Sequence, residues 1–88
     1  MNTTYLGLMM EFGTSQIPLE EVHEKYFSLS LALAKSRANT NQLPVPAYKV
    51  GTQKSGWIID AADLAALIDK NKAAATRDWN KMNGVRVA

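Results

Sequence analysis

The segment LPVPAYKVGTQKSGWIID, residues 43–60, decides how the rest of the chain is interpreted. An extended run ends at Gly51, and an apolar run resumes after Gly56. Two strand-like runs around a loop of glycines and small polar residues are typical of a β-hairpin. The four residues between the glycines, TQKS, supply one cation and three hydrogen-bonding side chains. We therefore predict a protruding hairpin over residues 45–59 whose tip approaches an anionic partner.

Size and composition restrict the possible protein classes. A chain of 88 residues forms one domain, here residues 1–88, and buries about two-thirds of its unfolded surface. With 47% hydrophobic and 20% charged residues it is globular rather than disordered. The absence of cysteine excludes disulfides, thiolate metal sites and thiol nucleophiles. The first apolar stretch is too short for a signal peptide or a membrane span, so we expect a cytoplasmic protein.

The charges are distributed unevenly along the chain. Residues 1–24 contain four glutamates and no lysine or arginine, whereas residues 25–59 contain five basic residues and no carboxylate. Residues 60–88 are nearly balanced, and the net charge is +2. A central span without acidic residues indicates an anionic partner for that span, although chance clustering is the alternative.

Two short helices are predicted between residues 18 and 42. Proline and two glutamates in IPLEEV, residues 17–22, are typical of a helix entry. Ser30 is a good N-cap for a second helix over residues 31–39, in which Leu33 and Ala34 are expected to turn inward. Two short helices joined by a tight turn form a helix-turn-helix.

The patterns at the two ends of the chain lead to different predictions. Residues 4–12 fit either a helix or a strand, and this alternative stays open. A long final helix is predicted over residues 60–83, with Asp60 as its cap and Gly84 at its end. Its length exceeds what so small a core needs, so its last turns are expected to pack on the N-terminal segment or on a second copy.

The order of these elements resembles a known family. IPLEEV (17–22), LPVP (43–46), GTQKS (51–55) and DLAALID (63–69) follow one another as in the pyocin activator protein PrtN family. The resemblance covers about residues 3–72 and implies a MerR-type winged helix-turn-helix, the plan also found in phage excisionases and AlpA-like regulators. The chain differs from the family pattern at residues 31–33, LAL, which are less polar and less basic. The fold class is therefore expected to be mainly α with a small β-hairpin.

Hydrogen-bond donors that point away from the core identify the candidate DNA contacts, because phosphates and major-groove bases offer acceptors. The second helix has such donors, and glycines in the hairpin, or wing, allow close approach to a phosphodiester chain. A solvated helix face and an ordinary exposed turn are the alternatives. The candidate DNA-binding residues are Ser30, Lys35, Ser36, Arg37, Asn39, Lys49, Gln53, Lys54 and Ser55.

Catalytic and metal sites are not expected. His23 is the only histidine and has no cysteine to join it as a ligand, so a packed imidazole is the better interpretation. The glutamates at 20, 21 and 24 lie early on a helix, where its dipole favours them, and they lack the context of an acid–base pair. We predict no enzyme activity and no cofactor.

The charge pattern and the predicted helix-turn-helix indicate a DNA-binding protein, and the resemblance implies a sequence-specific activator of prophage or pyocin-like genes. The resemblance also implies an alternative, an excisionase that bends attachment-site DNA. A third possibility is a protein-interaction module that binds a host protein through its last helix. The expected partners are double-stranded DNA, further copies of the chain bound cooperatively, and RNA polymerase or an integrase, with no membrane.

Overall fold

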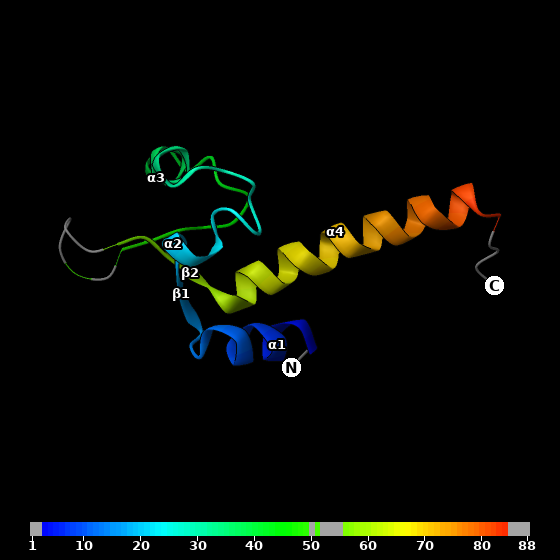
Figure 1. Ribbon diagram of the computed structural model, residues 1–88, viewed down its shortest axis with the longest axis horizontal. Helices are drawn as coiled ribbons and strands as arrows, with labels where there is room; N and C mark the ends of the chain where they lie inside the picture. The colour runs from blue at the N-terminus through cyan, green and yellow to red at the C-terminus, as the bar shows by residue number, and fades with distance from the viewer. Residues whose placement is uncertain (1–2, 50, 52–55, 85–88) are drawn as a thin grey trace.

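The protein is mainly helical, with a two-stranded antiparallel sheet and a long C-terminal helix (Figure 1). The computed structural model describes residues 3–49, 51 and 56–84. Their order is α1 (Thr3–Phe12), β1 (Gln16–Pro18), α2 (Leu19–Val22), α3 (Leu31–Asn39), β2 (Ile58–Asp60) and α4 (Ala61–Met82). The N-terminal segment is therefore a helix, which answers the question left open by its sequence.

The sheet joins two segments that are far apart in the sequence. β1 pairs with β2, and Ile17 lies opposite Ile59. The predicted hairpin over residues 45–59 is confirmed in part only, because β2 takes its ladder partner from before α2. Between the two runs, the described residues show one bridge, from Tyr48 to Ile58. Pro46 limits further pairing on the N-terminal side of Tyr48, since proline cannot donate to a strand ladder.

The bridge still closes a loop. The amide of Tyr48 donates to the carbonyl of Ile58 at 3.0 Å, and the reverse bond measures 2.7 Å. We call residues 48–58 the finger. Its tip, at 50 and 52–55, lies outside the described residues.

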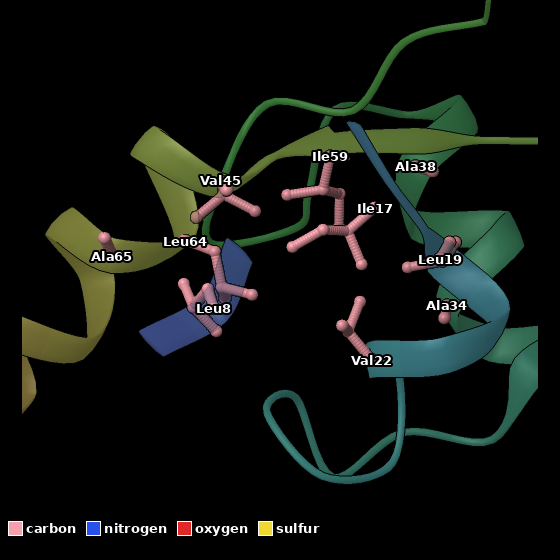
Figure 2. Close-up of a cluster of buried hydrophobic side chains, with 11 residues drawn as sticks. Leu8, Ile17, Leu19, Val22, Ala34, Ala38, Val45, Ile59, Leu64 and Ala65 are labelled. Carbon is pink, nitrogen blue, oxygen red and sulfur yellow. The ribbon is translucent and has the colours of Figure 1, made fainter. Parts of the chain in front are cut away.

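The hydrophobic core lies around the sheet. Ile17 and Ile59 are fully buried at its centre, with Leu8 and Leu64 on one side and Val22 on the other (Figure 2). Full burial of one such side chain contributes about 1.5–3 kcal/mol to stability. The core thus fixes β1, β2, α1 and the start of α4 as one unit. The other buried apolar residues are Leu19, Ala34, Ala38, Val45, Ala61 and Ala65.

The first helix of the predicted helix-turn-helix is shorter than expected. α2 spans only Leu19–Val22, and residues 23–27 form turns. In these turns His23 accepts at its carbonyl from the amide of Leu29, at 3.0 Å. Its ring nitrogen Nδ1 also lies 2.7 Å from the Leu29 carbonyl oxygen. His23 is therefore half-buried and holds the turn together through its two contacts with Leu29, in agreement with the prediction of a packed imidazole.

α3 has the predicted bounds and the predicted cap. The hydroxyl oxygen of Ser30 accepts from the amide of Leu33 at 3.2 Å, which satisfies one of the free donors of the first turn. Ala34 and Ala38 are buried and form the side that docks on the core. The expectation that Leu33 turns inward is wrong, since 43% of this residue is exposed. The four-residue spacing of the two alanines places Leu33 outside the docked face.

α4 extends well beyond the core. Asp60 occupies its N-cap position but makes no side-chain cap bond, because its carboxylate accepts from the Tyr48 hydroxyl at 2.7 Å. α1 packs on the first half of α4, where the Thr4 hydroxyl donates to Asp69 at 2.6 Å. The second half projects away from the molecule (Figure 1). The radius of gyration is accordingly 15.4 Å, against about 12 Å for a compact chain of this length.

Gly84, with φ +66°, lies just after α4, as its sequence predicts. The last turns of α4 do not pack on the N-terminal segment, since Trp79 is 58% and Met82 86% exposed. Within the described ranges, no helix is long and apolar enough to cross a lipid bilayer.

Candidate nucleic-acid interface

α3 presents its polar side chains to solvent, together with Ala32 and Leu33. Its inward side is occupied by Ala34 and Ala38, which leaves the rest of the circumference free. The predicted residues of this helix are all exposed: Lys35, Ser36, Arg37 and Asn39.

The two cations of α3 lie on opposite flanks of this face. At about 100° per residue, Lys35 and Arg37 are about 200° apart around the helix, and Ser36 lies between them on the outermost line. A helix seated in a groove would direct such flanking cations toward the two strands that border it, and would direct its middle toward the bases. The arrangement can therefore contact phosphates on both sides of one groove.

The start of α3 can also contact an anion. The Ser30 oxygen is used as an acceptor by the cap, but its hydroxyl is exposed and keeps its own proton for donation. The helix dipole favours a negative group at this end.

Leu33 is a candidate contact that the sequence analysis missed. It is exposed beside the polar face of α3, and an apolar side chain there can contact a thymine methyl group in the major groove. The sequence signal that could have identified it is the pair of small residues Ala34 and Ala38, four residues apart, which form the docked side of α3.

The base of the finger is firmly attached. The ammonium of Lys49 lies 4.8 Å from the centroid of the Trp57 ring, a cation–π contact. The carbonyl of Trp57 accepts from the amide of Leu19 at 3.0 Å, which ties the finger to the start of α2. Among the predicted finger residues, Lys49 is exposed in the structure, whereas Gln53, Lys54 and Ser55 lie outside the described residues.

Tyr48 ties the finger to the end of β2, just before α4. Its hydroxyl donates to Asp60, and this hydrogen bond raises the pKa of Tyr48. A Tyr whose folded-state pKa is raised adds stability below its ordinary pKa, and this stability is lost as the pH rises through the folded value.

The charge separation in the sequence is weaker in space. Glu20 belongs to the acidic N-terminal span, yet its carboxylate lies beside Gly56 in the finger. Its Oε1 atom is 3.2 Å from the point where a Cβ atom on residue 56 would lie. Lys25 belongs to the acid-free span, yet it pairs with Glu11 at 3.1 Å, and this hydrogen bond raises the pKa of Lys25. Within the described structure, the two cations of α3, Lys35 and Arg37, form no ion pair.

No metal centre is found in the described part of the chain, where no three His, Asp or Glu side chains come together. Shallow hollows flank the loop at 43–47. One is lined by Ala38, Asn41 and this loop, and the next by the loop together with Asp63, Ala66, Leu67 and Lys70.

A comparison with protein families identifies a family whose model matches most of the chain. The model described as Pyocin activator protein PrtN matches residues 4–75, from α1 through the middle of α4. No curated protein and no solved structure matches the chain at a significant level.

Proposed function

Because the chain belongs to the pyocin activator protein PrtN family, we propose that it is a sequence-specific DNA-binding activator of prophage or pyocin-like genes. In this proposal α2, the turn after it and α3 act as a helix-turn-helix, and the finger acts as its wing. The observation that carries the proposal is α3. It is capped, docked by two small residues and exposed along the whole of its polar face.

α3 enters the major groove in this proposal. Lys35 and Arg37 bind phosphates on the two bordering strands, and Ser36 and Asn39 donate to base edges. The small residues Ala34 and Ala38 support this placement, because they let α3 lie flat on the core and keep its axis fixed.

The finger lies on the neighbouring backbone or reaches the adjacent minor groove. Its attachment at Tyr48 and Trp57 supports this role, since a wing needs a fixed base to place its tip. Glu20 beside Gly56 repels phosphate near the base. The contacts are therefore assigned to the tip residues Gln53, Lys54 and Ser55, which lie outside the described structure.

Phosphate contacts supply most of the affinity in this proposal, and binding should weaken steeply as salt is raised. One copy covers few base pairs, so specific binding requires two or more copies that bind cooperatively.

The test is recovery of genome-wide bound DNA, followed by gel shifts of the recovered site across a salt series. We expect one shared motif upstream of phage-derived genes, and a plot of log binding constant against log salt with a steep negative slope. Absence of binding to any recovered duplex contradicts the proposal, and binding that ignores salt contradicts its electrostatic basis.

The same protein–DNA complexes can distinguish the function of an activator from that of an excisionase. Gel mobility with the site placed at different positions along a fragment reports bending. A strong bend at a site beside an integrase gene favours excision, whereas a straight site upstream of tail or lysis genes favours activation.

A further inference from the structure

The middle and the second half of α4 carry a basic face that the proposed function leaves unused. Residues seven and eleven apart are close to two and three whole helical turns, so Lys70, Arg77 and Lys81 lie within about 40° of one another. We call these three residues the basic stripe. All three are exposed. Trp79 is five whole turns after buried Ala61, so it continues the core-facing side of α4, on the opposite side from the basic stripe.

Carboxylates nearby do not neutralise the basic stripe. Within the described residues, none of the three cations forms an ion pair or a hydrogen bond. Asp69 accepts from Thr4 on the side of α4 that meets α1. Asp78 lies about 60° away from Lys81 around the helix, and Asp63 lies about two turns before Lys70, in the hollow beside the loop at 43–47.

The basic stripe lies on the same side of the molecule as α3. Lys70 lines a hollow with Pro44, Val45 and Pro46, which follow α3 in the chain. The same loop residues line the hollow beside Ala38 at the end of α3. α1, which carries Glu11, packs on α4 from the other side, as Figure 1 shows.

We propose that the basic stripe is a second nucleic-acid contact, which binds backbone phosphates of the duplex beside the segment held by α3. This inference rests on the proposed function. From Lys70 to Lys81 the stripe extends about 16 Å, the length of about five base pairs. The described base of the finger, at residues 48–49 and 56–58, and the second half of α4 lie on opposite sides of the central part of the molecule (Figure 1), so the stripe lengthens the bound segment on the side away from that base.

The side chains between the cations allow such an approach. Ala73 and Ala74 lie near the same face, and small residues let a bulky duplex come close to the helix axis. An amphipathic basic helix can also bind an anionic lipid surface. The shared side with α3 favours the duplex, because a membrane bound by α4 would not involve α3.

The experiment measures the salt dependence of binding for the full chain. The probe is a 30-base-pair duplex of unrelated sequence, so that phosphate contacts dominate. The variants are Lys70→Gln, Arg77→Gln, Lys81→Gln and the triple variant, with Lys72→Gln as the matched control. Lys72 is an exposed cation of the same helix, two residues after Lys70 and about 160° from it around the helix axis. Glutamine keeps helix propensity, and circular dichroism checks that helix content is unchanged.

Each substitution in the basic stripe should reduce the steepness of log binding constant against log salt by about 0.9, and the triple variant by about three times as much. Lys72→Gln should keep the parent slope. A triple variant with the parent slope overturns this inference and leaves the proposed function standing. An equal loss in Lys72→Gln also overturns it, since it would show only an effect of net charge. A parent chain that binds no duplex contradicts the proposed function itself, and binding to phosphatidylserine vesicles instead would assign α4 to a lipid surface.

Discussion

The two halves of α4 share one amphipathic pattern but have different surroundings. In the first half Ala61, Leu64 and Ala65 are buried against the sheet and α1. In the second half the same side of the helix carries Trp79 and Met82, which are mostly exposed. Sequence periodicity thus identifies the face that can be buried, and only the neighbouring elements decide whether it is.

The two halves of α4 therefore have different roles, one in stability and one in binding. The first half stabilises the fold, because it closes the core around Ile17 and Ile59. The second half adds little to the core and leaves both its apolar and its basic side open to partners. Substitutions in the first half should therefore change unfolding, and substitutions in the second half should change binding.

The largest effect is expected in the first half. Leu64→Ala removes a fully buried side chain between β2 and α1, and should lower the free energy of unfolding by about 2–5 kcal/mol. Urea denaturation followed by circular dichroism measures the change. A loss below 1 kcal/mol would mean that the first half of α4 is not part of the core.

A smaller effect is expected when the helix itself is broken beyond the core. Proline in a helix interior costs about 3 kcal/mol locally, but the second half of α4 can unwind without exposing the core. Ala75→Pro should therefore lower the circular dichroism helix signal while the free energy of unfolding falls by less than about 1 kcal/mol. A fall comparable to that of Leu64→Ala would show that the two halves are one cooperative unit.

The smallest effect on stability is expected at Trp79. Its exposure predicts that Trp79→Ala changes the free energy of unfolding by no more than about 0.5 kcal/mol. If a second copy covers this side chain on DNA, the variant should bind with reduced cooperativity. Titration of a duplex that holds two adjacent sites measures this, and unchanged cooperativity would exclude Trp79 from the contact between copies.

Much of the fold was predictable because local signals were strong. Ser30 and the turn after Asn39 mark the bounds of α3, and Gly84 marks the end of α4. β1 could not be predicted, since a three-residue strand has no periodicity and its partner lies about forty residues later in the chain. Its pairing with β2 depends on the whole core.

The candidate site was predictable by residue type and less so by position. Exposure of the α3 cations agrees with the prediction, but acidic side chains from outside the central span lie close to that span in the folded protein. Glu20 lies close to Gly56 in the finger, and Lys25 forms an ion pair with Glu11. The separation of charges along the chain did not predict these contacts. Folding brings the start of α2, which carries Glu20, next to the finger, where the amide of Leu19 donates to the carbonyl of Trp57.

The most direct test of the central claim is the ratio of affinities for the recovered site and a scrambled duplex. The claim is that α3 reads bases while the finger tip holds phosphate. Arg37→Ala should lower this ratio by the equivalent of about 1–3 kcal/mol, whereas Lys54→Ala should weaken both duplexes alike and keep the ratio. If both variants bind both duplexes like the parent chain, α3 and the finger are not the DNA-binding surface.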